Sequence, residues 1–329
     1  WLTAFAYGTS YFSAVIFIGY AGQFGWKFGV ASTWIGLGNA IIGSLLAWVI
    51  LGRRTRLMTH KLDSKTMPEF FARRFDSKLL RVVASFIIFI FLIPYTASLY
   101  NGLSRIFEMA FNIDYTYCII IMAVLTAIYV IVGGYFATAV NDFIQGLIML
   151  VGIVAVIAAV LSQNGGFMGS ITKLAEVSGD STIPGAYASF FGPLPLELLA
   201  VVILTSLGTW GLPQMVQKFY AIQNEEAIRK GTIISTVFAL IVAGGCYFLG
   251  GFGRLFMTSE EVAAVGYDAI IPSMLETLPD LLIGIVIILV LSASMSTLSS
   301  LVLTSSSTLT LDVIDKNIIK NMNEKKKLL

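Results

Sequence analysis

Residues 281–300, LLIGIVIILVLSASMSTLSS, begin as an unbroken apolar run and then fill with hydroxyl side chains, with no charge or turn signal between the two parts. A run of this length and apolarity can cross a bilayer as an α-helix. At 3.6 residues per turn, one face of that helix carries Ser292, Ala293, Ser296, Ser299 and Ser300, with Thr297 at its edge. Hydrocarbon offers those oxygens no partner, so this face must contact protein, water or an ion.

Two interpretations of this hydroxyl face are open. Serine and threonine are common small polar residues between packed membrane helices, so the face could serve helix packing alone. Alternatively it could bind sodium, because hard cations accept neutral hydroxyl and carbonyl oxygens as ligands. The rest of the sequence has to decide between them.

Composition places the chain among polytopic helical membrane proteins. Of its 329 residues, 57% are hydrophobic and 12% are charged, and the mean hydropathy is +0.85. A soluble globular protein usually has about a quarter of its residues charged. Cys118 and Cys246 lie in apolar runs and read as buried thiols. The single histidine, His60, argues against a histidine-based metal centre or catalytic triad.

Eight membrane-spanning helices are expected from the apolar runs. They cover residues 1–22, 29–51, 79–109, 117–132, 143–161, 196–220, 231–252 and 281–311. An interfacial loop is expected at residues 24–27, a break at Gly133-Gly134 and an amphipathic helix within residues 170–177. Thr66, Pro68 and Glu69 predict the start of a further short helix, with Thr66 as its N-cap.

The distribution of Lys and Arg predicts the orientation. With the start of the first helix inside, the inside segments are 52–81, 134–142, 218–230 and 312–329. They carry nine, none, three and five basic residues, which is 17 of the 21 in the chain. Because cytoplasmic loops are enriched in Lys and Arg, the loop at residues 53–81 and the C-terminal tail are expected to be cytoplasmic.

Two of the expected helices are interrupted at corresponding points, five helices apart. Gly and hydroxyl residues interrupt the first at positions 7–13, and Gly208, Gly211 and Pro213 interrupt the sixth. Single interruptions are common in membrane helices. A matched pair indicates an inverted-repeat secondary transporter, whose unwound backbone lines the binding cavity. The expected divisions are a five-helix repeat at 1–163, an external loop at 164–195 and the start of a second repeat at 196–329.

Five stretches of the chain resemble the sodium:solute symporter family, whose core is a LeuT-like five-plus-five inverted repeat. Four of them are residues 10–19 (SYFSAVIFIG), 66–75 (TMPEFFARRF), 133–146 (from Gly133-Gly134-Tyr135 to the NDFIQG run) and 293–300 (ASMSTLSS). The fifth, residues 211–221, resembles the sodium/proline branch of that family. The likeness covers nearly the whole chain and implies core helices one to eight, so we expect a portion of a longer protein.

The resemblance implies two sodium sites. The common site would take backbone carbonyls of Thr9, Phe12 and Ala293 and hydroxyls of Ser296 and Thr297. In some members a second ion lies nearer the cytoplasm, and its ligands here would be Asp142, Ser296, Ser299 and Ser300.

Asp142 also has a structural interpretation. It precedes an apolar run and has Gln145 three residues on, so it could cap the fifth helix. If the helix instead begins nearer Phe136, the carboxylate lies inside the membrane protein, where an ionisable group indicates function. One carboxylate among hydroxyls would offset the charge of an ion without holding it too tightly.

The solute is expected beside the two breaks and against the third helix. Candidate contacts are Tyr11, Ser13, Tyr95, Ser98, Trp210 and Gln214, although the aromatic ones often serve packing or interfacial anchoring. We expect no Arg or Lys in this cavity, so an anion would depend on helix N-termini. The resemblance favours an amino acid such as proline, followed by a monocarboxylate or a vitamin-like anion.

The sequence therefore predicts an all-α secondary transporter, a sodium-coupled symporter of a small organic solute that works by alternating access in the cell membrane. A symporter driven by protons, or a channel for ions or small solutes, is the alternative. A channel would typically show a pore loop or rings of like charge, which the sequence lacks. A membrane enzyme would need clustered His, Asp or Glu within the spans, and Asp142 is the one candidate. No nucleic-acid partner is expected.

Overall fold

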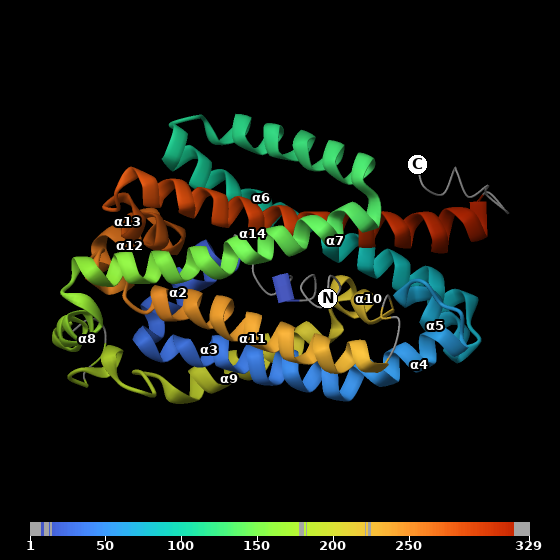
Figure 1. Ribbon diagram of the computed structural model, residues 1–329, viewed down its shortest axis with the longest axis horizontal. Helices are drawn as coiled ribbons and strands as arrows, with labels where there is room; N and C mark the ends of the chain where they lie inside the picture. The colour runs from blue at the N-terminus through green and yellow to red at the C-terminus, as the bar shows by residue number, and fades with distance from the viewer. Residues whose placement is uncertain are drawn as a thin grey trace.

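A computed structural model describes residues 8–9, 13, 15–177, 181, 183–220, 222 and 225–318. This part of the chain is helical and contains no strand. Figure 1 shows the long helices running roughly along the longest axis of the molecule. The interruption predicted for the first helix lies mostly outside the described residues. Within it, Gly8 and Thr9 are helical and Ser13 is not.

The first two expected helices extend beyond their predicted ends. Segment η1 (Val15–Tyr20) leads directly into α2 (Ala21–Phe28), so the loop predicted at residues 24–27 is wrong. The second helix continues past residue 51 through η2 (Gly29–Ser32), α3 (Thr33–Gly38), η3 (Asn39–Leu46), η4 (Trp48–Gly52) and α4 (Arg53–Lys61). Gly29 joins α2 to this helix with a φ of 64°, which a residue with a side chain rarely adopts.

Helix α5 (Met67–Phe75) begins as the sequence predicts. Thr66 is its N-cap, and the Thr66 hydroxyl accepts a hydrogen bond from the backbone N–H of Glu69 at 3.2 Å. The Glu69 side chain accepts from the N–H of Lys65 instead of that of Thr66. Asp76 ends the helix with a left-handed backbone at φ 49°.

Helices α6 (Lys78–Phe111) and α7 (Tyr115–Gln163) form two long crossings. Pro94 lies inside α6, as expected. The sequence predicts an interruption of the helix at Gly133-Gly134. This prediction is wrong, because helical hydrogen bonding continues through all 49 residues of α7. A straight helix of this length would span about 74 Å, far more than a bilayer. Figure 1 shows the green ribbon of α7 bending back on itself instead.

The predicted break in the sixth helix is confirmed. Helix α9 (Pro195–Gly208) passes into η6 (Thr209–Gly211), and α10 (Pro213–Tyr220) follows at a bend of 49°. Leu212 is extended, with ψ at 119°, because a residue before proline is pushed out of the helical region. The preceding loop contains α8 (Gly166–Glu176), which overlaps the predicted amphipathic helix and begins before it.

The last part of the chain contains α11 (Glu225–Gly250) and α14 (Asp280–Ser307), which continues as η9 (Thr308–Ile318). Helix α11 begins six residues before its predicted start at 231. Two short helices that the sequence analysis did not predict, α12 (Ser259–Val265) and α13 (Ile270–Glu276), join α11 to α14.

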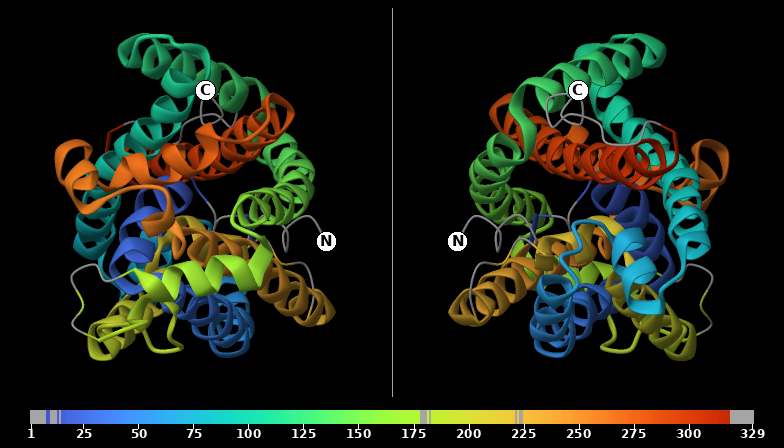
Figure 2. Two further views of the ribbon diagram at one scale, coloured as in Figure 1. Left: turned by 90° about the vertical axis from the view of Figure 1, so that its left-hand side faces the viewer. Right: turned by 90° about the vertical axis from the view of Figure 1, so that its right-hand side faces the viewer.

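The helices pack in two groups, and each group contains helices from both halves of the chain. Helix α14 lies against α7 and α6, while α11 lies against α2 and α3, as Figures 1 and 2 show. Glycines allow close approach within the second group, where a methyl at Gly25 would overlap the backbone of Gly250. The contact between α14 and the beginning of the chain positions the site described below.

Five helices in the described part of the chain are long and apolar enough to cross a membrane, or six if α9 and α10 form one bent span. The eight predicted spans are therefore not confirmed as a count. A multi-pass helical membrane protein is the class that these helices define.

Candidate functional site

The hydroxyl face of α14 contacts the first helical segment of the chain. The Ser296 hydroxyl donates a hydrogen bond to Thr9 Oγ1 at 3.0 Å, and both side chains are fully buried. All five residues of the predicted hydroxyl face are buried, and so are Ser294 and Leu298 on other sides of α14. Polar oxygens therefore meet inside the protein at the interface between two chain segments that are distant in sequence.

Four of the five residues predicted for the common sodium site lie within the described part of the chain. The Thr297 hydroxyl donates to the Ala293 carbonyl at 3.1 Å, and Thr297 adjoins Ser296 on α14. Together with Thr9 these residues gather hydroxyl and carbonyl oxygens in a buried place. Phe12 lies outside the described residues.

Asp142 lies in the interior of α7 and is 2% exposed. The capping interpretation is wrong, because α7 begins at Tyr115 and is capped there by Asp114. The Ser296 hydroxyl lies against the Asp142 carboxylate but donates its hydrogen to Thr9. Asp142 Oδ1 is buried and has no hydrogen-bond partner among the described residues. The Asp142 side chain therefore lies beside Ser296 of α14.

A buried lysine lies beside this carboxylate. Lys218 on α10 is 7% exposed, although its position suggested the inside loop at residues 218–230. The Lys218 ammonium lies 3.5 Å from Asp142 Oδ2 and donates to Ser300 Oγ at 3.1 Å. A buried charge requires such a partner, because desolvation of an isolated ammonium is expensive.

The four residues predicted for the second sodium site are all buried. Asp142 and Ser300 share Lys218 as a partner, and Ser299 donates to the Ser296 carbonyl at 2.9 Å. Contacts through Lys218 thus join α7, α10 and α14.

Two of the solute candidates are buried polar residues. Gln214, at the start of α10, is 3% exposed, and its Oε1 atom has no hydrogen-bond partner among the described residues. Ser13 is 1% exposed and accepts a long hydrogen bond of 3.4 Å from the N–H of Ile16. Tyr95 on α6 packs against a buried apolar cluster that α6 and α14 form.

Other solute candidates use their polar groups elsewhere. The Trp210 indole N–H donates to the Ile42 carbonyl at 2.9 Å, which attaches the broken helix to η3. Ser98 is exposed and donates to the Pro94 carbonyl one turn earlier in α6. Tyr11 lies outside the described residues.

Sequence reasoning missed Lys218, Gln217 and Gln145. Thr304 on α14 donates to Gln217 Oε1 at 2.8 Å, and the Gln145 Oε1 atom is buried without a hydrogen-bond partner among the described residues. The available signal was that Lys218 falls within the broken span 196–220, where an ionisable residue indicates a functional site. That signal was overlooked because Lys218 was counted among the basic residues of the inside segment 218–230.

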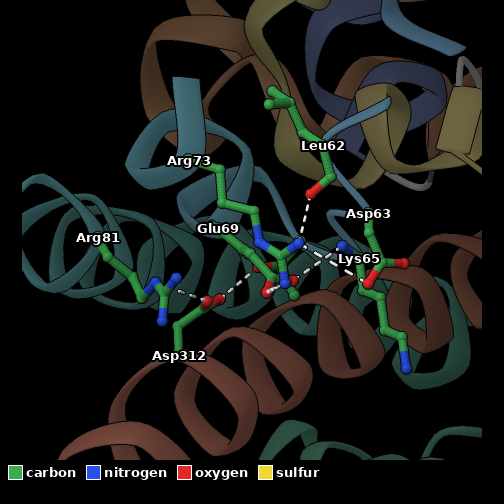
Figure 3. Close-up of polar contacts among 8 residues, drawn as sticks. Leu62, Asp63, Lys65, Glu69, Arg73, Arg81 and Asp312 are labelled. Atoms are coloured by element: carbon green, nitrogen blue, oxygen red, sulfur yellow. Dashed lines mark hydrogen bonds and ion pairs between the residues drawn. The ribbon is translucent and has the colours of Figure 1, made fainter. Parts of the chain in front are cut away.

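A second polar cluster joins the loop after α4 to the end of the chain's last described helix (Figure 3). Thr66 donates to Asp312 Oδ2 at 2.5 Å, and Arg81 Nε lies 3.9 Å from Asp312 Oδ1. Arg73 pairs with Glu69 at 2.8 Å and donates to the Leu62 carbonyl. These contacts hold α5 and the start of α6 against η9.

Buried hydroxyls, a carboxylate and an ammonium meet inside a multi-pass helical membrane protein. The family model of the sodium:solute symporter family matches residues 1–329, and the chain belongs to this family. The resemblance inferred from the motifs is thereby confirmed.

Relatives with known names agree with this assignment. The chain is 28% identical over 319 residues to a sodium/proline symporter of Staphylococcus aureus and 27% identical over 307 residues to a sodium/pantothenate symporter of Haemophilus influenzae. These alignments cover 95% and 91% of this chain, and it spans 60% of the length of each relative.

A solved structure supports the fold. A Na+-coupled sialic acid symporter in a substrate-bound, outward-open state is similar to this chain with a TM-score of 0.81 at 18% sequence identity. The similarity covers 100% of this chain and 68% of that protein. It confirms the predicted LeuT-like class of fold.

Proposed function

We propose that the protein is a sodium-coupled symporter that carries a small organic solute across the cell membrane by alternating access. The observation that carries this proposal is the buried meeting of Thr9, Ser296 and Asp142. Neutral oxygens beside one carboxylate are suitable ligands for a monovalent hard cation that must also be released. The first sodium ion would bind to Thr9, Phe12, Ala293, Ser296 and Thr297, and a second to Asp142, Ser296, Ser299 and Ser300.

The solute would bind near the break between α9 and α10. Gln214 begins α10 and has an unpartnered buried acceptor, so it is the leading contact, with Tyr11, Ser13, Tyr95, Ser98 and Trp210 as further candidates. Named relatives transport proline and pantothenate, and both solutes carry a carboxylate. The proposed solute class is therefore an amino acid such as proline, or a monocarboxylate or vitamin-like anion.

The proposed arrangement divides the chain into a first repeat at 1–163, an external loop at 164–195 and a second repeat from 196. Nine basic residues between positions 52 and 81 support a cytoplasmic position for that segment and for the C-terminal tail. The polar cluster around Asp312 would then lie at the cytoplasmic face.

The test is solute uptake by the full-length protein in proteoliposomes. Labelled proline, pantothenate and sialic acid are offered under an inward sodium gradient, an inward proton gradient without sodium, or neither. Saturable uptake of one solute under the sodium gradient alone supports the proposal. Uptake that follows the proton gradient instead would establish the proton-driven alternative, and uptake that does not saturate would indicate a channel.

A further inference from the structure

Lys218 occupies the place where the second sodium ion would bind. Its ammonium donates to Ser300 and pairs with Asp142, which are two of the four proposed ligands of that ion. The three side chains come from α10, α14 and α7 and are at most 8% exposed. Water is therefore largely excluded from the pair.

Lysine and sodium compete for this carboxylate. Each supplies one positive charge, and two like charges held close together in a buried place repel each other. The single negative charge of Asp142 balances one cation. In addition, the Ser300 oxygen that accepts from Lys218 is directed at the ammonium and not at an ion.

The pair is also incomplete, which leaves room for a different partner. The Lys218–Asp142 distance of 3.5 Å is long for a charge-assisted hydrogen bond, which is usually about 2.7–2.9 Å. Asp142 Oδ1 is buried without a hydrogen-bond partner among the described residues. Asp142 Oδ1 accepts no hydrogen bond from these residues and Oδ2 is weakly bonded, so the carboxylate can still ligate an ion.

We propose that Lys218 is a tethered cation that competes with sodium for Asp142, so that a second sodium ion binds only when Lys218 withdraws. This inference rests on the proposed sodium coupling. Lys218 lies on α10, directly after the break in the sixth helix, so movement of α10 at that break would carry the ammonium away from Asp142. Arrival of the second ion would thereby be coupled to the position of the broken helix.

The variant Lys218→Met tests the competition in the full-length protein. Sodium-dependent thermal stabilisation in detergent, with choline as the reference cation, reports ion binding without requiring transport. If Lys218 occupies the site about 90–99% of the time, its removal should lower the half-maximal sodium concentration by about 10- to 100-fold. Adding Asp142→Asn to Lys218→Met should abolish that gain.

Matched variants separate competition from a structural ion pair. Lys230→Met removes a lysine from an exposed pair with Glu226 and should leave the sodium response unchanged. Lys218→Gln, which keeps a donor for Ser300 without the charge, replaces Lys218→Met if the latter does not fold, and it should show the same increase in sodium affinity.

The outcomes distinguish this inference from the proposed function. A sodium response in the Lys218 variant that is equal to or weaker than that of the wild type overturns the competition, as does a gain that persists without Asp142. A wild type that does not respond to sodium, together with a responsive Lys218 variant, supports the competition and contradicts sodium coupling in the wild type. If the wild type responds to sodium and the Lys218 variant responds at lower sodium concentrations, both the competition and sodium coupling are supported.

Discussion

The side-chain oxygens of Ser296 and Thr9 lie 3.0 Å apart, although 287 positions separate them in the sequence. This contact joins α14 to the first helical segment and is fully buried. Two hydroxyls that are buried away from water can hydrogen-bond to each other, as they do in ordinary helix packing. Their closeness to Asp142, whose Oδ1 atom lacks a partner among the described residues, favours an ion site instead.

Removing hydroxyls from this contact should weaken sodium binding. Ser296→Ala and Thr297→Ala each delete one proposed ligand, and loss of a buried polar partner costs about 1–3 kcal/mol. We expect the sodium concentration for half-maximal uptake to rise by roughly 5- to 150-fold, the usual range for coupled sites.

Ser306→Ala on the same α14 helix is the control, since Ser306 is exposed and donates within its own helix to the Leu303 carbonyl. Sodium dependence that is the same in all three variants would rule out the first-site assignment.

Gln214 and Trp210 should behave differently as solute contacts. Gln214→Leu keeps the side-chain size but removes the amide, so a lost hydrogen bond of about 0.5–1.5 kcal/mol should raise the KM for the solute roughly two- to tenfold. Trp210→Phe loses a bond to the Ile42 carbonyl and should lower thermal stability with little change in KM. Solute uptake kinetics and unfolding temperature, measured for both variants, separate the two roles. A larger KM change for Trp210→Phe would reverse the assignment.

Local signals made much of this fold predictable. The Pro213 break and the Thr66 cap follow from backbone chemistry, and both are confirmed. The hydroxyl residues of α14 are buried, but Ser294 and Leu298 on other sides of the helix are buried too, so burial does not single out one face. The helix count is not confirmed, and the loop at Gly133-Gly134 is wrong. Glycine permits a turn but does not require one, and α7 remains helical there.

The position of Lys218 could not be obtained from charge counting. The positive-inside rule assigns a lysine near the end of a span to the loop, and it does not register a carboxylate 76 positions away. Packing of α10 against α14 brings the Lys218 side chain to Asp142 on α7. Similarly, only the three-dimensional structure shows that Trp210 uses its N–H on Ile42.

Close packing at Gly25 should be essential for stability. A methyl group there would overlap the backbone of Gly250, and overpacking usually costs about 1–3 kcal/mol. Gly25→Ala should therefore lower the unfolding temperature. Gly284→Ala is the matched helical control, because nothing lies within 4 Å of the added methyl, and it should be neutral or stabilising by up to about 1 kcal/mol. Equal unfolding temperatures for the two variants would contradict the packing argument.

Asp142 should determine the number of coupled sodium ions. Asn would keep a polar side chain inside α7 but would remove the charge that balances either Lys218 or an ion. In Asp142→Asn we expect the sodium Hill coefficient and the charge moved per solute to fall. Ser300→Ala should combine non-additively with it, because ligands of one ion act as a unit. Unchanged values of both quantities in Asp142→Asn would limit coupling to the first site.

Asp312 should hold α5 and α6 against η9, as Figure 3 shows. Asp312 is 2% exposed, and Asp312→Ala removes both its hydrogen bond from Thr66 and its ion pair with Arg81. A lost buried partner of about 1–3 kcal/mol should increase local opening by roughly 5- to 150-fold. The buried Ser64, in the turn before α5, is a suitable reporter of that opening.

The measurement is the rate at which a maleimide labels Ser64→Cys, alone and combined with Asp312→Ala. When closing is fast, this rate follows the population of the open form. Asp312→Asn keeps an acceptor for Thr66 without the charge, so its labelling rate should fall between the other two. Glu226→Ala, which breaks an exposed pair with Lys230, is the control and should have no effect, since surface pairs contribute little. If Ser64→Cys is labelled no faster with Asp312→Ala than with Glu226→Ala, the polar cluster does not hold α5 and α6 against η9. Apolar packing alone would then hold these helices together.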